Sequence, residues 1–169
     1  ARLTGGLGVC MASNGPGVAN LLPGIAVEQG EGNRVLAITS SRRTGITGPE
    51  RGGTYQYFDQ AGVIGKMSKW SERVASFDRI PERLRAALRA CWEGRPGVVH
   101  LDVPEDVMNG RVKANLAFWE PARYRRTAPV PPPDEQVQQA ADWLLTAERP
   151  VLHAGSGVIP AGAFDELRA

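Results

Sequence analysis

Short apolar runs in the first part of the chain predict buried strands. Three runs are apolar at most positions, as strands in the interior of a parallel sheet are, and they span residues 8–13, 34–39 and 97–103. Turn residues flank each run. Strands of this kind, separated by helical patterns, predict an α/β fold in which a parallel sheet is flanked by helices.

Helical patterns occupy the segments between and around these runs. Residues 78–92 place apolar side chains on one face at helical spacing, with Asp78 as the expected cap. A second helix follows the first strand, and Pro23 predicts a kink or a late start there because proline lacks a backbone N–H. Residues 1–6 favour a helix that runs into a turn, whereas the pattern of residues 63–70 specifies no element.

A change of composition divides the chain. Residues 1–112 hold the predicted sheet, and residues 113–133 are rich in proline and predict an extended linker. Residues 134–169 contain a further helix and a predicted strand at 151–154, so they indicate the truncated start of a second, Rossmann-like α/β domain. Because the chain lacks an initial Met and both ends fall inside structural patterns, we expect it to be part of a longer protein.

Composition and charge argue against several kinds of partner. Hydrophobic residues make up 42% and charged residues 22% of the 169 positions, which is ordinary for a globular protein. The net charge of +2 is too small to indicate a polyanion, and the basic residues at 111–126 have acidic neighbours. No apolar run reaches the ~18 residues of a membrane helix, and no signal peptide is evident. We therefore expect no nucleic acid, no membrane and a cytoplasmic location.

Cysteine and histidine supply no recognisable metal or catalytic motif. Cys10 lies in an apolar run and Cys91 in a helical pattern, so both are predicted to be reduced core residues. His100 lies inside an apolar strand and is interpreted as a core histidine, and Asp102 as structural. We expect no metal site in this chain, and no G-x-S-x-G elbow supports a serine hydrolase.

Two polar segments are candidates for a ligand site. Residues 13–20 follow a strand and open a helix, where glycines allow close approach to the backbone and N–H groups are free; a plain tight turn is the alternative. Residues 52–60 alternate aromatic and amide side chains, which suits a ring-binding pocket or an amphipathic segment that packs Tyr55 and Phe58 inward. A weaker nucleotide-binding signal is the glycine turn of Gly155, Ser156 and Gly157.

Taken in order, these segments resemble the pyrimidine-binding domain of thiamine-diphosphate-dependent enzymes of the acetolactate synthase kind. The resemblance covers most of residues 1–110. It rests on Thr4-Gly5-Gly6, the stretch Ser13 to Leu21, Gly24-Ile25-Ala26, Val35 to Thr39, Tyr55-Gln56, Lys69, Gly94 to Gly97 and Asp102 to Asp106. Residues 134–169 resemble the start of the family's central domain, where the glycine turn at 155–157 would be on the flavin side.

The resemblance implies a cofactor and residue roles. Four residues match the turn that lines the pyrimidine side of thiamine diphosphate: Gly15, Pro16, Gly17 and Asn20. Tyr55 and Gln56 match an aromatic–glutamine pair near the reacting centre and are the catalytic candidates. Such enzymes decarboxylate a 2-keto acid and transfer its acyl unit to a second keto acid. The family also implies Mg²⁺, FAD in some members, and active sites between the subunits of a homodimer or homotetramer.

The sequence also departs from the family pattern. The family glutamate precedes the Ser-x-Gly-Pro-Gly turn and the domain that binds Mg²⁺ and diphosphate follows, so we expect both outside this chain and expect the chain alone to be inactive. The loop at 40–54 is longer than in acetolactate synthase and carries Arg42, Arg43 and Arg51, while Tyr57 replaces an acidic residue. Four other functions therefore remain alternatives: sulfoacetaldehyde acetyltransferase, glyoxylate carboligase, a 2-keto acid decarboxylase and a non-catalytic cofactor-binding relative.

Overall fold

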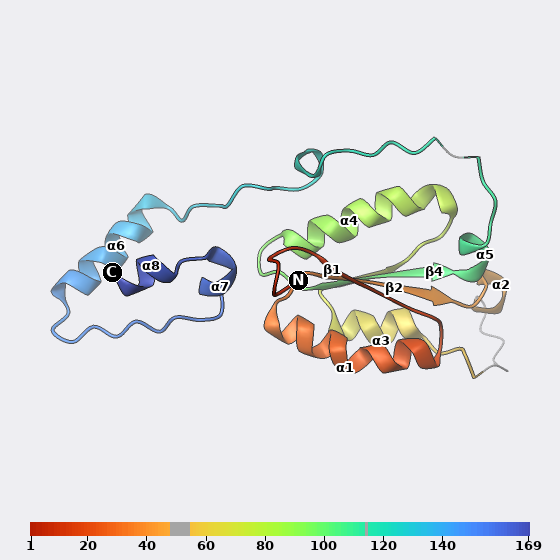
Figure 1. Ribbon diagram of the computed structural model, residues 1–169, viewed down its shortest axis with the longest axis horizontal. Coiled ribbons are helices and arrows are strands. Elements are labelled where there is room, and N and C mark those ends of the chain that lie inside the picture. Colours follow the sequence, from red (N-terminus) through yellow and green to blue (C-terminus); the bar gives the residue numbers. More distant parts are fainter. Residues whose placement is uncertain (48–54, 114) are drawn as a thin grey trace. The chain divides into compact units, whose positions relative to one another are not determined.

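A four-stranded parallel sheet organises the first part of the chain (Figure 1). The computed structural model describes residues 1–47, 55–113 and 115–169. The strands are β1 (Gly8–Ala12), β2 (Val35–Ser41), β3 (Trp70–Arg73) and β4 (Val98–Pro104), in the order β1-β2-β4-β3. The predicted α/β fold with a parallel sheet flanked by helices is thus confirmed.

Helices cover both faces of this sheet (Figure 1). On one face lie α1 (Pro16–Glu31) and α3 (Gln60–Met67), and on the other lies α4 (Ile80–Trp92), which follows the 3-10 turn η1 (Phe77–Arg79). The short helices α2 (Thr44–Thr47) and α5 (Glu105–Met108) come directly after β2 and β4. The carboxyl ends of β1, β2 and β4 therefore all lead into segments that meet at one edge of the sheet.

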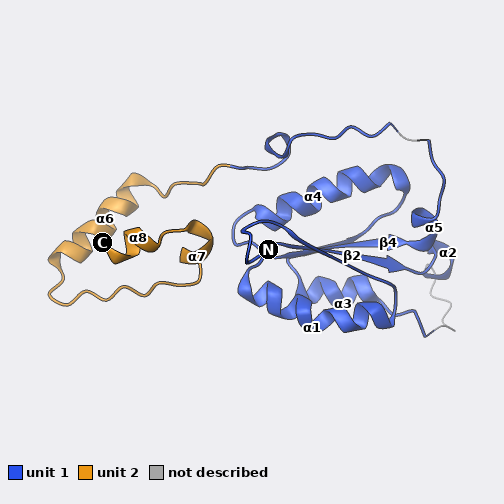
Figure 2. Ribbon diagram, viewed as in Figure 1, with its two compact units in different colours: residues 1–127 blue, residues 128–169 orange. Residues whose placement is uncertain are grey.

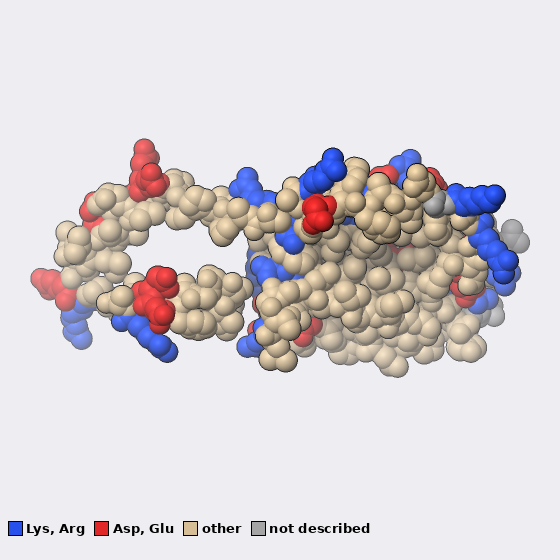
Figure 3. All heavy atoms as spheres, turned by 45° about the horizontal axis from the view of Figure 1, so that its top comes forward, with Lys and Arg blue, Asp and Glu red and all other residues tan. Residues whose placement is uncertain are grey.

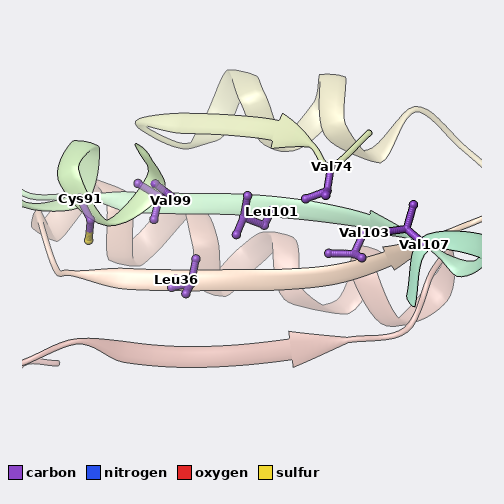
Figure 4. Packing of buried hydrophobic residues seen from close by; sticks show 8 residues of the cluster. Leu36, Val74, Cys91, Val99, Leu101, Val103 and Val107 are labelled. Atoms are coloured by element: carbon purple, nitrogen blue, oxygen red, sulfur yellow. The ribbon is translucent and has the colours of Figure 1, made fainter. Parts of the chain in front are cut away.

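The core lies between the sheet and α4, as the helical pattern of α4 predicts (Figure 4). Its buried members are Leu36, Val74, Ala87, Cys91, Val99, Leu101, Val103 and Val107. A second cluster packs under α1 and α3 on the opposite face and contains Val18, Ile25, Ala37, Ile64 and Val98. Strand β4 contributes to both and is buried on both faces, so even its polar residues His100 and Asp102 are enclosed.

Several local predictions are corrected by the structure. Residues 1–6 form turns without a helix, and Gly5 has a positive φ of 65° that a helix excludes. Helix α1 begins at Pro16, so the late start is wrong; Pro23 is tolerated inside the helix because it is exposed and water can reach the carbonyl it leaves unpaired. Asp78 does not cap α4, because its carboxylate bonds to the Ser76 hydroxyl instead.

Strand β1 is not buried as predicted. It is an edge strand, and its side chains alternate: Val9 is 58% exposed and Met11 70% exposed. Cys10 is consequently only half-buried, whereas Cys91 is a core residue; both thiols are free. Burial raises the pKa of both thiols above the ordinary value, which makes them poor nucleophiles.

The chain divides into the units Ala1–Thr127 and Ala128–Ala169 (Figure 2). The second unit contains α6 (Asp134–Thr146), α7 (Val158–Ala161) and α8 (Phe164–Arg168), none of which buries a side chain. The strand predicted at 151–154 is not formed there. The described part of this unit has no other strand to supply ladder hydrogen bonds, so the apolar run stays irregular. The second domain itself remains a prediction.

The connector, residues 115–127, is bound to α4, a contact that the extended linker predicted from its composition does not specify. The Arg85 guanidinium donates to the Ala117 carbonyl at 2.6 Å and lies 3.9 Å from the centre of the Trp119 ring. Arg89 donates to the Tyr124 carbonyl at 2.7 Å. Cation–π contacts and backbone hydrogen bonds therefore hold the connector on the first unit, and this unit continues to Thr127.

We expect Trp119→Ala to release the connector. Trp119 is contacted by Arg85 and by Arg123, and two cation–π contacts of about 1 kcal/mol each should correspond to a tenfold or larger increase in tryptic cleavage after Arg123. Limited trypsin digestion followed by mass spectrometry measures this rate. The matched control is Phe118→Ala, because that side chain is 91% exposed. Equal cleavage rates in the two variants would contradict the role of the Trp119 ring.

Candidate functional site

The ends of three strands are tied together at the carboxyl edge of the sheet. Asn14, just after β1, donates its backbone N–H to the Ser40 hydroxyl at 3.0 Å, and its side-chain amide lies 3.4 Å from a carboxylate oxygen of Glu105. Glu105 also accepts from Arg42 at 2.9 Å and faces Arg43 at 3.8 Å. This network fixes the turn that follows β1, because both the backbone and the side chain of Asn14 are held.

The turn after β1 meets the segment that contains Gln56. Gly15 has a φ of 66°, a left-handed conformation that favours glycine. A Cβ atom at Gly15 would lie 2.5 Å from the Cα of Gln56, which is far inside van der Waals contact. Two segments about forty residues apart, each singled out in the sequence, therefore touch backbone to backbone.

The other candidate residues surround this contact. Pro16 and Gly17 are the first two residues of α1, and a Cβ at Gly17 would lie 2.7 Å from the Ser13 hydroxyl oxygen. Asn20 lies exposed one turn further along α1. Tyr55 is 84% exposed beside Gln56, so the alternative in which it packs inward is wrong, although Phe58 does pack against the second core cluster. Arg51 lies outside the described residues.

A buried amide anchors the start of α3 beneath the strand ends. The Gln60 side-chain nitrogen lies 2.7 Å from the Ser40 carbonyl, 2.7 Å from an Asp102 carboxylate oxygen and 3.0 Å from the Thr39 hydroxyl. The other Asp102 oxygen accepts from Arg73 Nε at 2.7 Å. Asp102 is fully buried, so its charge is stabilised by this ion pair and by the amide. Asp102 is structural, as the sequence predicts.

His100 is confirmed as a core histidine with both ring nitrogens paired. The Ser71 hydroxyl donates its one hydrogen bond to the Ala61 carbonyl, so it accepts a hydrogen bond from His100 Nδ1–H at 2.8 Å. Nε2 then accepts from the Thr39 hydroxyl at 2.8 Å. The imidazole is thus neutral, and burial lowers the pKa of His100 to about 4, against the opposing charge of Asp102.

Charges at this edge are largely compensated. Asp106 accepts from the backbone N–H and the hydroxyl of Thr44, and the hydroxyl bond holds the pKa of Asp106 below its ordinary value. Arg42 and Arg43 both face Glu105. On the face shown in Figure 3, Lys and Arg side chains lie in several places with Asp and Glu among them. Because these charges are paired, the edge would act on a ligand mainly by orienting it with backbone and amide groups.

The candidate flavin-side turn belongs to the second unit. Gly155, Ser156 and Gly157 are exposed in the second unit, and Gly157 precedes the four-residue helix α7. A Cβ at Gly155 or Gly157 would meet no atom within 4 Å. Within residues 1–47, 55–113 and 115–169, no group of three or more His, Cys, Asp or Glu side chains is placed to hold a metal ion. No helix in the described part of the chain could cross a bilayer.

Three residues of this edge were not identified as site candidates in the sequence: Ser40, Thr39 and Glu105. These three residues end or closely follow predicted apolar runs, and the carboxyl ends of parallel strands gather at one edge of a sheet. That position is the signal that identifies Glu105 and Ser40. Gln60 ends the candidate segment 52–60, but no strand end marks it, because it begins a helix that the pattern of residues 63–70 does not define.

Comparison with known proteins gives one family for this arrangement. Residues 1–63 match the family model described as thiamine pyrophosphate enzyme, N-terminal TPP binding domain. A probable acetolactate synthase large subunit of Methanocaldococcus jannaschii is 35% identical over 99% of this chain and 28% of its own length. An acetolactate synthase large subunit of Corynebacterium glutamicum is 37% identical over 100% of this chain and 26% of its own length.

The chain spans little more than a quarter of these relatives, and the similarity extends along both of its units. The glycine turn that meets Gln56 lies within the matched domain, at residues 13–20. Residues 1–63 therefore form part of an N-terminal domain of the thiamine pyrophosphate enzymes, and the chain as a whole is similar to acetolactate synthase large subunits.

Proposed function

We propose that the protein containing this chain is an acetolactate synthase-like enzyme that decarboxylates a 2-keto acid and transfers the acyl unit to a second keto acid. The observation that carries the proposal is the contact of Gly15 with the backbone of Gln56. It joins the turn that would hold the cofactor to the residue that would act beside it. Similarity to acetolactate synthase large subunits at 35–37% identity supports the choice of reaction.

The residues at the edge fit the pyrimidine side of thiamine diphosphate. Gly15 and Gly17, on either side of Pro16, have no side chains at the start of a 16-residue helix, whose first N–H groups are not used within the helix. Asn20 offers an amide one turn later on the same helix. Bound thiamine diphosphate supplies the electron sink that allows a 2-keto acid to lose carbon dioxide.

The chain's own contribution is orientation. Gly15 keeps the turn close to Gln56, and the Gln56 amide would hydrogen-bond the keto acid next to the cofactor. The exposed Tyr55 ring would cover that position and exclude water. The proposal includes Mg²⁺ bound outside these residues and FAD bound at the turn of Gly155, Ser156 and Gly157. It also includes a homodimer or homotetramer with shared active sites and a cytoplasmic location.

Pyruvate turnover by the intact protein tests this function. With thiamine diphosphate, Mg²⁺ and pyruvate, we expect release of carbon dioxide together with acetolactate, measured by coupled spectrophotometry and colorimetry. Carbon dioxide without acetolactate would leave a keto-acid decarboxylase and contradict acyl transfer to pyruvate. The absence of both products and of thiamine diphosphate binding by calorimetry would refute the proposed function altogether.

A further inference from the structure

Gln60 is a buried polar residue that the proposed chemistry does not use directly. It is the first residue of α3 and only 2% exposed. Burial removes the water around its amide, which therefore needs hydrogen-bond partners within the protein. Its side-chain nitrogen carries two protons and has three acceptors within reach, the Ser40 carbonyl, Asp102 and Thr39. The two shortest contacts, both 2.7 Å, tie the start of α3 to the ends of β2 and β4.

The acceptor side of this anchor is itself fixed. Asp102 lies in the central strand β4, is fully buried, and receives Arg73 Nε at 2.7 Å on its second oxygen. The Ser40 carbonyl belongs to β2, which is paired along its length with β1 and β4. Gln60 therefore hydrogen-bonds groups that cannot follow a movement of α3, so its amide fixes the start of this helix against the sheet.

Only three residues separate Gln60 from the candidate catalytic glutamine. The chain between them is short and ordered: the Gln60 N–H donates to the Phe58 carbonyl at 2.7 Å, and Asp59 caps α3 by accepting from the Gly62 N–H at 3.0 Å. At its other end, Gln56 lies against Gly15. The segment 56–60 is thus held at one end by the glycine turn and at the other by the strand ends.

We propose that Gln60 is a positioning residue, whose amide hydrogen bonds to Asp102 and the Ser40 carbonyl hold Gln56 against the Gly15 turn. The inference rests on the proposed function, because it assigns Gln60 a role through Gln56. Gln60 touches neither cofactor nor substrate. Loss of its hydrogen bonds shifts the segment 56–60 and misplaces the Gln56 amide, while the glycine turn itself stays fixed by Asn14.

The test compares Gln60→Met with Gln138→Met in the intact enzyme. Methionine keeps the length and volume of glutamine but has no donor, and Gln138 is an exposed glutamine of α6 that bonds Asp142. For Gln60→Met we expect kcat for the keto acid to fall about 10- to 100-fold. The KM and the affinity for thiamine diphosphate should change by about threefold at most. Amide hydrogen exchange at residues 55–58 should accelerate, whereas that of α1 should not. Gln138→Met should match the unmodified enzyme.

Other outcomes separate this inference from the proposed function. An unmodified enzyme that neither binds thiamine diphosphate nor reacts overturns both. A reactive unmodified enzyme whose Gln60→Met variant keeps full kcat, or only melts at a lower temperature, overturns the inference alone. If Gln60→Met does not fold, Gln60→Asn replaces it: the shorter amide cannot reach both acceptors, so the same fall in kcat with retained cofactor affinity is expected, and unchanged kcat would overturn the role.

Discussion

Replacing Gly15 with alanine is expected to lower kcat/KM of the intact enzyme about 100-fold. Two effects act together. Alanine is strained at a φ of 66°, at a cost of roughly 1–2 kcal/mol. Its Cβ would also lie 2.5 Å from the Gln56 Cα and 3.0 Å from the Gln56 carbonyl carbon, so backbone must move rather than a flexible side chain. A shift of about 1 Å restores van der Waals contact and misplaces Gln56 against the bound cofactor.

Gly30→Ala is the matched control for that variant. Gly30 is a glycine inside α1, where a Cβ meets no atom within 4 Å and φ is not positive. We expect unchanged kcat/KM and a gain in stability of about 0.5–1 kcal/mol, because alanine is the better helix former. Steady-state kinetics and thermal melting measure both quantities. If Gly15→Ala retained full activity, the close approach of the two segments would have no role in the reaction.

The second large effect is a loss of stability in mild acid, caused by His100. Its pKa is about 4 in the folded protein and about 6.5 in the unfolded chain, so only the unfolded chain binds the proton between these values. The contribution of His100 to the free energy of unfolding is therefore complete above pH 6.5 and declines as the pH falls. By pH 4 the loss should reach about 3 kcal/mol.

Urea unfolding at pH 7 and pH 4 measures this loss, and two substitutions isolate it. His100→Gln removes the titrating group while keeping a donor and an acceptor, so its stability should fall less between the two pH values than that of the unmodified protein. His153→Gln is the control, because His153 is the other histidine of the chain and is exposed. Equal pH dependence in all three proteins would mean that His100 is not buried as a neutral imidazole.

The strands and helices that the sequence predicts are those with a strong apolar pattern. β2, β4 and α4 are long enough for that pattern to be unambiguous, and all three are present. β3 has four residues, three of them polar, and it exists because β4 offers it a partner. The opposite error occurs at 151–154, where an apolar run finds no partner strand. Pairing over long distances is information that a local pattern does not contain.

The candidate site shows the same division between local and long-range information. Motif resemblance identifies Gly15 and Gln56 separately, but their contact depends on the path of the chain between β2 and α3. The sequence correctly makes His100 a core residue, yet it gives no sign that Thr39 and Ser71 pair with its ring nitrogens. Buried hydrogen-bond partners have no periodicity, so they become visible only when the strands are placed side by side.

The attachment of the connector to α4 changes where the first unit can be separated from the rest of the protein. A chain cut at residue 112, where composition changes, would leave Arg85 and Arg89 without their carbonyl partners. It would also remove Arg125, which lies 4.1 Å from the centre of the Trp92 ring and helps to cover it. The smallest version of this domain suited to folding alone therefore ends near Thr127, fifteen residues beyond the boundary that the sequence suggests.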